Sequence, residues 1–369
     1  MANDVEILAM RVASELARRG LGATSPNPIV GALVLDSTGQ VQVGSGWHQR
    51  AGGPHAEVVA LEAAGTRARG GTLVVTLEPC AHQGRTPPCV EAVLTAGVSR
   101  VVVGVPDPTD VGGGAARLRA AGVDVEVGVE AADCARDNEA WLLAVQRQRP
   151  FVVLKQATSL DGRVAAADGS SQWITGTDAR LDGHRLRGES DAVLVGSATV
   201  LADDPHLTAR DADGQRVGTQ PVRVVLDTGL RTPPDARVFD DAAPTLLFTA
   251  STDAGRHGAY ADAKVDVVSV PFARHGGVDL EAVLAELYAR DVRQVLVEGG
   301  AQVAGSFVDA RLVDRVVAYV APLLLGGEGP LALGGLGAAT IDAGWRLRLD
   351  DVTQVGADVR LTARPAEVA

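Results

Sequence analysis

The sequence predicts an α/β protein of two domains. Apolar, strand-like runs alternate with helix-like stretches along most of the chain, a pattern typical of sheets covered by helices. The 369 residues exceed the usual size of a single hydrophobic core. The polar, basic segment LLAVQRQRP ends at Pro150, and the alternation restarts after it. We therefore place domains at residues 1–147 and 148–369.

The first domain opens with an amphipathic segment. Val5, Leu8, Val12 and Leu16 recur at helical spacing with charges between them, which predicts a surface helix and not a signal peptide. Strand-like and helix-like stretches then alternate through IVGALVLD, TLVVTLEPC, CVEAVLTAG, RVVVGVPD, AARLRAAG and VDVEVGVE.

The second domain shows a comparable alternation. The expected strands are FVVLKQA, DAVLVG, PVRVVLD, TLLFT, VDVVSV, QVLVEGG and RVVAYVAPLLLGG, and the expected helices include 178–189, 279–290 and 301–310. The polar, Gly/Asp/Thr-rich segments 211–220 and 251–264 are interpreted as surface loops.

Charge and composition narrow the class of partner. A net charge of −12 and a pI near 5.1 argue against a nucleic-acid partner, because such binding needs clustered Lys and Arg. We therefore expect a small-molecule substrate. No apolar run approaches the ~18 residues of a membrane span, so no membrane partner is expected. Three cysteines fit a reducing, cytoplasmic setting better than a disulfide scaffold.

Three short stretches predict a zinc site. His55 lies in PHAEVVAL, Cys80 in TLEPCAH and Cys89 in TPPCVEAVL, each near an expected strand or helix end. His, Cys and Cys are suitable Zn²⁺ ligands, and three protein ligands leave a fourth position open. Glu57 lies two residues after His55, where it could transfer protons. H-x-E followed by P-C and a second cysteine is the signature of zinc-dependent nucleobase deaminases.

The same residues also have structural explanations. A closed structural zinc site would need a fourth Cys or His at suitable spacing, and buried cysteines are often only small hydrophobes. Cys134 lies far from these motifs and is interpreted as structural. Eight residues, AHQGRTPP, separate Cys80 from Cys89, instead of the two residues of the general deaminase pattern.

Several longer motifs make the chain resemble the bifunctional riboflavin-biosynthesis deaminase–reductases. They are SPNPIVGA, GWHQRAGGPHAE, TLEPCAHQGRTPPC, KQATSLDGR, SQWITG, ATVLADDPHLTAR and VEGGAQVAGSF, and they span almost the whole chain. The resemblance implies a cytidine-deaminase-like N-terminal domain and a dihydrofolate-reductase-like C-terminal domain. It implies deamination of a diaminopyrimidinone ribosylamino 5′-phosphate, then NADPH-dependent reduction of the ribosyl group to ribityl.

In the first domain, the resemblance assigns Asn27, His48 and Arg85 to the pyrimidine ribosyl-phosphate. Zinc would be held by His55, Cys80 and Cys89, with Glu57 as the catalytic proton carrier. The chain departs from the family in PDPTDVGGGAARL, where a shorter loop lacks the usual Arg. We therefore assign no contact to residues 111–115.

In the second domain, the resemblance assigns two further groups of residues. The substrate group is Ser171, Arg187, Leu207, Arg210 and Glu298. The NADPH group is Ala157, Trp173, Thr199, Asp203, Thr228, Gly300, Ala301, Gln302, Val303, Ala304, Gly305 and Ser306. The guanidinium groups of Arg187 and Arg210 suit phosphate, Glu298 could accept hydrogen bonds from ribose hydroxyls or form a salt bridge, and Lys155 is a candidate for the reductase proton relay.

Two rival functions also fit parts of the sequence. One is a nucleoside or tRNA-base deaminase whose C-terminal domain only recognises substrate, and another is a zinc-stabilised interaction module without activity. For the enzyme we expect Zn²⁺ and NADPH as cofactors and a homo-oligomer. The sequence does not distinguish NADPH from NADH, because no Arg for the 2′-phosphate can be picked out.

Overall fold

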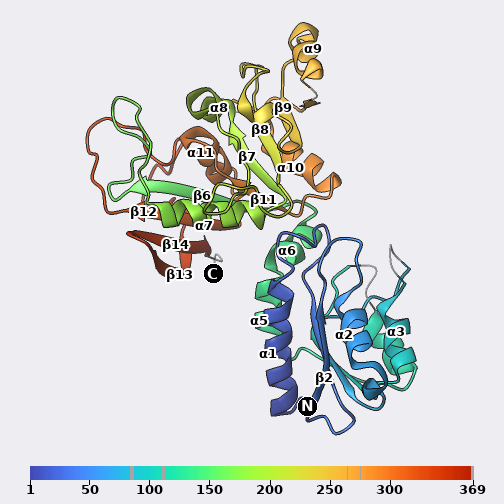
Figure 1. Cartoon of the computed structure of the whole chain (residues 1–369). Helices are drawn as coiled ribbons and strands as arrows, with labels where there is room; N and C mark the ends of the chain where they lie inside the picture. The colour runs from blue at the N-terminus through green and yellow to red at the C-terminus, as the bar shows by residue number, and fades with distance from the viewer. Residues whose placement is uncertain (84–86, 110–112, 264, 275, 367–369) are drawn as a thin grey trace. The chain divides into compact units, whose positions relative to one another are not determined.

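The computed structural model describes every residue except 84–86, 110–112, 264, 275 and 367–369 and the side chain of residue 262. The chain divides into two compact units, Met1–Gln148 and Arg149–Ala369. Both are α/β, as predicted (Figure 1). Among the described residues, no helix has the length and apolar character needed to cross a membrane.

The first unit is a five-stranded sheet covered by helices. Its strand order is β2-β1-β3-β4-β5. Strand β1 is antiparallel to both of its neighbours, β2 and β3. Strands β3, β4 and β5 are parallel to one another. The strands are β1 (Gly31–Leu35), β2 (Gln42–Trp47), β3 (Thr72–Leu77), β4 (Arg100–Val105) and β5 (Asp124–Val127). The helices are α1 (Asp4–Arg18), α2 (Ala56–Ala64), α3 (Cys89–Ala96), α4 (Gly114–Ala120), α5 (Ala131–Asp137) and α6 (Glu139–Arg147), with a 3-10 turn at Gly65–Ala68.

Alternation along β1 divides the core of this unit between the two faces of the sheet. Leu33 and Leu35 pack with α1 and with Cys134 of α5, whereas Ala32 and Val34 pack with α2 and α3 on the other face. Successive side chains of a strand point to opposite faces. The unit therefore has three layers, and the zinc-ligand candidates lie on the α2–α3 side.

The predicted apolar face of α1 is partly wrong. Leu8 is 62% exposed, whereas Ala9, Ala13 and Ala17 are buried. A Cβ on Gly31 would lie 1.9 Å from the carbonyl oxygen of Ala13. The helix backbone thus approaches β1 too closely for large side chains, so small residues form the buried face.

The second unit is built on a nine-stranded sheet of order β10-β9-β8-β7-β11-β6-β12-β14-β13. Seven strands are parallel, and β14 is antiparallel to both β12 and β13. The strands are β6 (Phe151–Ser159), β7 (Ala192–Gly196), β8 (Val222–Leu226), β9 (Thr245–Thr249), β10 (Asp266–Ser269), β11 (Gln294–Val297), β12 (Arg315–Ala321), β13 (Leu347–Val355) and β14 (Asp358–Pro365). The helices are α7 (Thr177–Gly188), α8 (Ser197–Asp203), α9 (Ala254–Asp262), α10 (Leu280–Ala289) and α11 (Ala301–Asp309), with a 3-10 turn at Arg237–Phe239.

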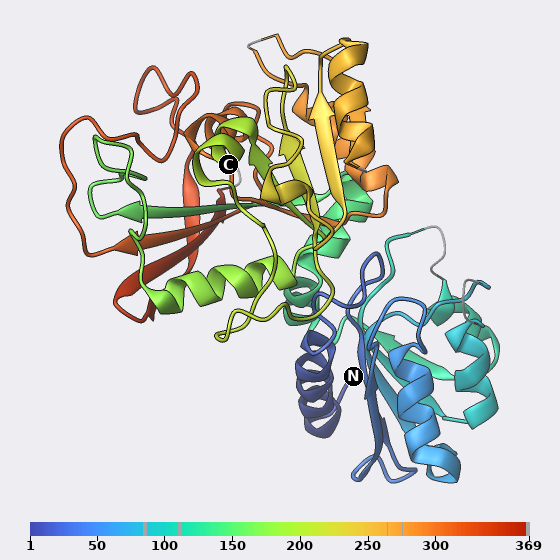
Figure 2. The same cartoon turned by 45° about the horizontal axis from the view of Figure 1, so that its top comes forward.

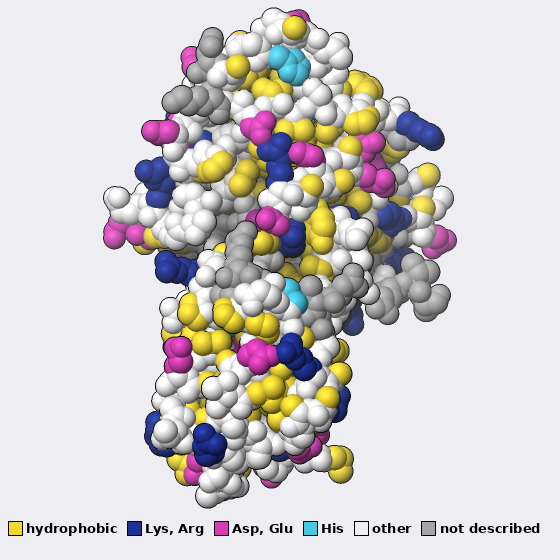
Figure 3. Space-filling view, turned by 90° about the vertical axis from the view of Figure 1, so that its right-hand side faces the viewer, with side chains coloured by type: hydrophobic (Ala, Val, Ile, Leu, Met, Phe, Trp, Pro, Cys, Tyr) yellow, Lys and Arg dark blue, Asp and Glu magenta, His cyan; other side chains and the backbone are white. Residues whose placement is uncertain are grey.

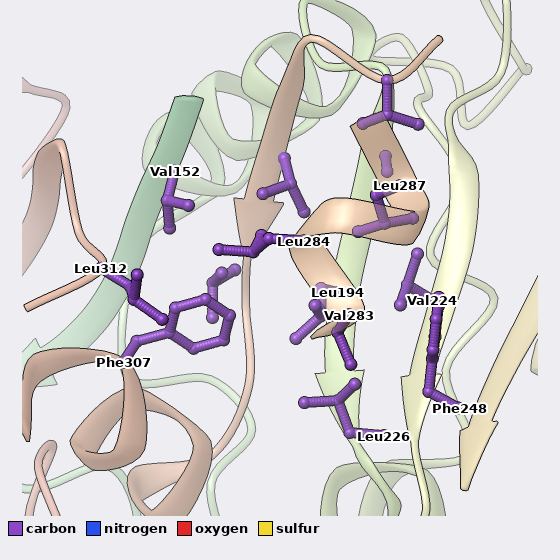
Figure 4. Close-up of a cluster of buried hydrophobic side chains, with 14 of the residues drawn as sticks. Val152, Leu194, Val224, Leu226, Phe248, Val283, Leu284, Leu287, Phe307 and Leu312 are labelled. Atoms are coloured by element: carbon purple, nitrogen blue, oxygen red, sulfur yellow. The ribbon is translucent and has the colours of Figure 1, made fainter. Parts of the chain in front are cut away.

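Helices cover both faces of the parallel part of this sheet. Val283, Leu284 and Leu287 of α10 and Phe307 of α11 pack on an aliphatic cluster from β6, β7, β8, β9 and β11 (Figure 4). On the other face, Gly183 of α7 lies against the side chain of Lys155. Parallel strands that are buried on both faces read as continuous apolar runs, which is why these strands could be predicted.

The segment 251–264, predicted to be a loop, contains α9 (Figures 1 and 2). Asp253 caps this helix, because its carboxylate accepts hydrogen bonds from the backbone N–H groups of Gly255 and Arg256. Tyr260 is its buried anchor, and its hydroxyl donates to the Thr232 carbonyl. The other segment that was predicted to be a loop, 211–220, contains neither a helix nor a strand.

Candidate active sites

The structure brings the three candidate zinc ligands together. His55 caps the N-terminus of α2, Cys80 follows β3, and Cys89 is the first residue of α3. Their ligand atoms all lie within 4.8 Å of one another. His55 Nδ1 lies 3.1 Å from Cys89 Sγ and 3.7 Å from Cys80 Sγ. Ligand atoms about 2.0–2.3 Å from a tetrahedral zinc would be roughly 3.5–3.8 Å apart, so the donor set and its spacing fit that ion.

The environment of Cys80 favours its thiolate form, which a zinc ligand requires. The largest effect on the pKa of Cys80 is a hydrogen bond with the Cys89 thiol, which lowers it. Burial opposes this effect, and a hydrogen bond with His55 adds to it, so that the pKa of Cys80 is lowered to about 4. The backbone N–H of Cys89, at the start of α3, also donates to Cys80 Sγ at 3.3 Å. The helix N-terminus therefore supplies a donor directly to this sulfur.

Glu57 lies in the first turn of α2 with only 3% of its surface exposed. Burial raises the pKa of this carboxyl, although the positive charge of His55 opposes that effect. Its carboxyl group also hydrogen-bonds with the Cys89 side chain. A carboxyl group that is buried beside the ligands and readily protonated has the properties of a proton carrier.

Asn27 and His48 form a second layer beside the same site. Asn27 Nδ2 lies 3.3 Å from His48 Nε2, and His48 Nδ1 lies 3.0 Å from the carbonyl oxygen of Pro54. Since the carbonyl can only accept, Nδ1 donates and Nε2 accepts from the amide. Burial lowers the pKa of His48, which favours this neutral form. Its ring packs edge-on against His55, with the ring centroids 5.3 Å apart.

Arg85 lies outside the described residues. Sequence reasoning missed Glu78, which directly precedes the P-C pair. Its carboxylate accepts hydrogen bonds from the backbone N–H groups of Asp107 and Ala115. In the shortened loop 111–115, residues 111 and 112 are also outside the described part. Gly114, which follows them, lies so close to Pro79 that a Cβ would meet its carbonyl oxygen at 1.8 Å. Glu78 and Gly114 thus hold the start of α4 against the segment that carries Cys80.

In the second unit, the chemically distinctive group lies where β11 ends. Glu298 receives two hydrogen bonds from Arg187 of α7, Nε to Oε1 at 2.6 Å and Nη2 to Oε2 at 2.9 Å. Lys155 Nζ of β6 lies 3.7 Å from the same carboxylate. Burial alone would raise the pKa of Glu298, but the two cations lower it to about 2. The salt bridge expected as one possibility for Glu298 is therefore present.

Of the remaining substrate candidates, Arg210 is joined to this ion pair through Thr208. Arg187 Nη1 donates to the carbonyl of Thr208, and Arg210 Nε donates to the Thr208 hydroxyl at 2.8 Å. Leu207 is buried and has a left-handed backbone, with φ of 53°. Ser171 is half-buried in the segment between β6 and α7 and has no contact with this group among the interactions described. All three donor nitrogens of Arg187 therefore face protein groups, which was not expected of a phosphate ligand.

Sequence reasoning also missed three residues linked to Lys155 or Arg187, namely Tyr319, Asp182 and His184. The Lys155 ammonium lies 5.9 Å from the ring centroid of Tyr319, whose hydroxyl donates to Asp182 at 2.7 Å. His184 of α7 donates from Nδ1 to the Thr208 carbonyl. The sequence carries no signal for these contacts, because they join β6, α7 and β12.

Several cofactor candidates follow the carboxyl ends of the parallel strands, namely Thr199 after β7, Thr228 after β8 and Gly300 after β11. Gly300 caps α11, and its N–H donates to the hydroxyl of Thr199 in α8 at 3.1 Å. A Cβ on Gly299 would lie 2.6 Å from the Val303 side chain. The glycine turn therefore lies directly against the helix it precedes, with backbone N–H groups at its N-terminus that suit a pyrophosphate.

The other cofactor candidates differ in their accessibility. Trp173 is 67% exposed with Arg180 stacked on it, and Asp203, at the end of α8, has a pKa raised by burial. Thr228 follows β8, and its carbonyl accepts a hydrogen bond from Thr249. Ala157 lies half-buried on β6, and Ala301, Gln302, Val303 and Ser306 lie on the first two turns of α11.

Two members of the run 300–306 are not available to a ligand. Ala304 is buried in the core, and its N–H donates to the Gly300 carbonyl. Gly305 faces the backbone of Gly334, where a Cβ would meet the carbonyl oxygen at 2.3 Å. The expectation that the whole run contacts phosphates is therefore corrected, because from the second helical turn onward the N–H groups are used by the helix itself.

Comparisons with known proteins identify both units. Residues 4–105 match the cytidine and deoxycytidylate deaminase zinc-binding region, and residues 150–361 match the RibD C-terminal domain. The riboflavin biosynthesis protein RibD of Mycobacterium tuberculosis strain H37Rv is 44% identical over 357 residues, 96% of each chain. RibD of Escherichia coli K12 is 40% identical, covering 95% of this chain and 97% of that one.

Solved structures agree with these matches. RibD of Acinetobacter baumannii superposes with a TM-score of 0.90 at 38% identity, covering 98% of this chain and 99% of that one. A diaminohydroxyphosphoribosylaminopyrimidine deaminase/5-amino-6-(5-phosphoribosylamino)uracil reductase of Thermotoga maritima gives 0.85 at 35% identity, with the same coverage. The expected deaminase and reductase folds are thus confirmed, and the alternative of a deaminase with a non-catalytic second domain is not supported. The chain belongs to the RibD family of bifunctional riboflavin-biosynthesis enzymes, with a zinc-dependent deaminase and an NADPH-dependent reductase in one polypeptide.

Proposed function

We propose that residues 1–147 deaminate 2,5-diamino-6-ribosylamino-4(3H)-pyrimidinone 5′-phosphate and that residues 148–369 reduce its ribosyl group to ribityl. The proposal rests on the two activities in the name of the Thermotoga maritima enzyme and on the two family matches. The single observation that carries the first activity is the convergence of His55, Cys80 and Cys89 around a buried Glu57.

In the deaminase domain we assign His55, Cys80 and Cys89 as zinc ligands. When bound, zinc supplies an activated water for attack on the carbon that carries the amino group. Glu57 would accept a proton from that water and pass it to the ring nitrogen. It would then take the proton of the newly added hydroxyl group and pass it to the departing amine, so that ammonia leaves as the carbonyl forms.

Substrate binding in this domain is assigned to Asn27, His48 and Arg85. The hydrogen bond from Asn27 to His48 fixes the orientation of both side chains, which leaves the amide oxygen of Asn27 for the pyrimidine ribosyl-phosphate. The second bond of His48, to the Pro54 carbonyl, holds its ring against His55. Arg85 would supply positive charge for the phosphate.

In the reductase domain the substrate would lie beside Lys155, Arg187 and Glu298. NADPH, when bound, supplies the hydride that reaches C1′ of the opened ribosyl chain. Lys155 is the proton donor that we assign to the ring-opened form, because its ammonium is held between Glu298 and the Tyr319 ring. Ser171, Leu207 and Arg210 complete the substrate group.

The cofactor assignment follows the strand ends. The first turn of α11, which Gly300 caps, would receive the pyrophosphate, since its N–H groups lie at a helix N-terminus. The other assigned contacts are those of Ala157, Trp173, Thr199, Asp203 and Thr228. Ala304 and Gly305 are excluded from this proposal by their burial.

The test separates the two activities with one substitution. Glu57→Gln removes the proton carrier and keeps a side chain of the same size. We expect the purified variant to retain zinc by metal analysis, to lose ammonia release from the diaminopyrimidinone phosphate, and to oxidise NADPH normally when given the deaminated intermediate. Unchanged ammonia release would refute the role of Glu57, whereas an unaltered protein that releases no ammonia would revive the non-enzymatic zinc module.

We also propose that the enzyme works in the cytoplasm as a homo-oligomer, without a nucleic-acid partner. Its three cysteines are free, and acidic and basic side chains are interspersed on the face drawn in Figure 3. Strand β13 is a largely exposed sheet edge that carries Leu349 and Val352 outward, which favours pairing with another chain. Light scattering of the purified protein measures the oligomeric state.

A further inference from the structure

The sequence alone could not show how the reductase would distinguish NADPH from NADH. The two cofactors differ only by a phosphate on the 2′-oxygen of the adenosine ribose. Dinucleotide enzymes that prefer NAD place a carboxylate at the end of a strand against the ribose hydroxyl, whereas NADP enzymes place an arginine nearby for the phosphate. The residues that follow β8 can be judged by the same chemistry.

A carboxylate does follow β8, but it is turned away from solvent. Asp227 is fully buried. Its Oδ2 accepts hydrogen bonds from the backbone N–H of Arg231 at 2.6 Å, from the N–H of Thr232 at 2.7 Å and from the Thr232 hydroxyl at 2.9 Å. Asp227 therefore acts as a cap for the turn 228–232, and it cannot present its charge to a ribose.

The group that this turn presents to solvent is the guanidinium of Arg231. Its side chain is 63% exposed, and its Nη2 donates to the Ser197 hydroxyl at 2.8 Å. Its Nε lies 3.9 Å from Asp227, a contact too long for a hydrogen bond. The buried carboxylate thus orients the arginine without forming a close, bidentate pair with it.

The contact with Ser197 places Arg231 next to the proposed cofactor site. Ser197 is the first residue of α8, and Thr199, two residues later, holds the N–H of Gly300 at the start of α11. Thr228, another assigned cofactor residue, belongs to the same turn as Arg231. In the sheet, β7 lies between β11, which precedes the glycine turn, and β8, which precedes the turn of Arg231. Arg231 therefore lies on the β8 side of the proposed cofactor site.

A second arginine, Arg256 of α9, supports the turn. Arg256 Nη1 donates to the carbonyl of Gly229 at 2.7 Å, while its Nε lies 3.5 Å from Asp253, the cap of α9. Arg256 is thus engaged with Gly229 and Asp253. Of these two arginines, Arg231 is the one that links the turn to α8.

We propose that Arg231 is the residue that selects NADPH over NADH, by pairing its exposed guanidinium with the 2′-phosphate beside the Ser197 hydroxyl. The proposal rests on the reductase function proposed above, and it adds a specificity residue to that site. A guanidinium can donate two parallel hydrogen bonds to a phosphate, and a charged bond of this kind is about twice as strong as a neutral one. Loss of this pair should weaken NADPH alone, because NADH has no group for it.

The experiment compares Arg231→Gln with the unaltered full-length protein by direct binding. Titration calorimetry with NADPH, NADH, 2′,5′-ADP and 5′-AMP requires no turnover. We expect Arg231→Gln to weaken NADPH and 2′,5′-ADP by about 10- to 100-fold, as for the loss of one charged bidentate contact, and to leave NADH and 5′-AMP unchanged. Arg231→Lys should retain part of the preference for NADPH, because it keeps the positive charge but not the two parallel donors of the guanidinium.

The matched control is Arg290→Gln. Arg290 is also a partly exposed arginine beside carboxylates, Glu286 and Asp266, but it lies where α10 ends, before the start of β11. We expect no change in any of the four affinities. Ammonia release by the first domain serves as a check that the purified variants are intact.

The outcomes separate this proposal from the reductase assignment. A wild-type protein that prefers NADPH, with an Arg231→Gln variant that keeps the whole preference, would overturn the role of Arg231 and leave the reductase function standing. An equal loss of NADPH and NADH affinity would also overturn it, since the residue would then support the turn and not read the phosphate. A wild-type protein that binds neither dinucleotide would overturn the proposed cofactor site and the role of Arg231 with it.

Discussion

The buried pair of Arg187 and Glu298 allows a quantitative prediction of stability. We consider Arg187→Met, which removes the charge and keeps much of the aliphatic stem. Each pKa unit is worth about 1.4 kcal/mol, so lowering the pKa of Glu298 from its ordinary 4.5 to about 2 corresponds to about 3 kcal/mol at neutral pH. Mutational experience with broken buried pairs gives about 3–5 kcal/mol. We expect a loss near 3 kcal/mol, because Lys155 still faces the carboxylate at 3.7 Å.

The sign of the pH dependence follows from the direction of the shift. A carboxylate whose pKa is lowered by folding stabilises the folded state at pH values above about 4.5, and this stabilisation is lost as the pH falls toward 2. The unaltered protein should therefore lose stability over that range. Arg187→Met should show a weaker dependence, because the pKa of Glu298 then lies closer to its unfolded value.

The assay must report on the reductase unit alone, because a chain of two compact units does not unfold in a single two-state transition. Urea titration followed by hydrogen exchange of peptides from β6 and β11 meets that need. The control Arg290→Met breaks exposed pairs and should cost less than about 1 kcal/mol. The double variant Arg187→Met, Glu298→Gln should recover part of the loss. A loss below 1 kcal/mol for the single variant, or no recovery in the double one, would refute the argument.

Three further substitutions test the rest of the structure. Cys89→Ser removes one of three ligands and should reduce the zinc content of the purified protein to well below one ion per chain by metal analysis, whereas Cys134→Ser should leave it unchanged. Gly31→Ala places a Cβ 1.9 Å from the Ala13 carbonyl oxygen and should destabilise the first unit by about 1–3 kcal/mol, as overpacking does. Urea-dependent hydrogen exchange of β1 measures this loss, and an unchanged urea midpoint would contradict the close approach of α1. Gly305→Ala should destabilise the second unit similarly, read from β11, because its Cβ would meet Gly334.

The parts of the fold that could be predicted were those with a strong local signal. The parallel strands of both units are continuous aliphatic runs, and the zinc motif carries its own residue types. The hairpin of β13 and β14 was not predicted, because LRLDDVTQV mixes charged and apolar residues and is exposed along most of its length, so neither face shows an apolar alternation. The strand predicted over RVVAYVAPLLLGG ends at Ala321, since Pro322 lacks the N–H of a ladder bond.

The prediction of the buried face of α1 was partly wrong for a different reason. Hydrophobic periodicity identifies a helix and its apolar stripe, but the choice of Ala9, Ala13 and Ala17 over Leu8 depends on how closely the helix approaches β1. That distance is set by Gly31 on another element. A contact between two segments that are distant in the sequence leaves no periodic trace in either of them.

The same limit applies to the reductase site, where the sequence predicts Arg187 and Glu298 as separate substrate ligands and the structure pairs them. Their pairing is an expensive arrangement, because a buried ion pair often adds no stability over a well-packed apolar pair of the same volume. Here Lys155 lies beside the pair, and all three residues lie where β11 ends, next to the glycine turn at Gly300. Stability alone gives no reason to bury three charged groups at this edge of the sheet. Their retention there is better explained if the polar substrate exchanges hydrogen bonds with them, so that the pair holds the site in order until the substrate arrives.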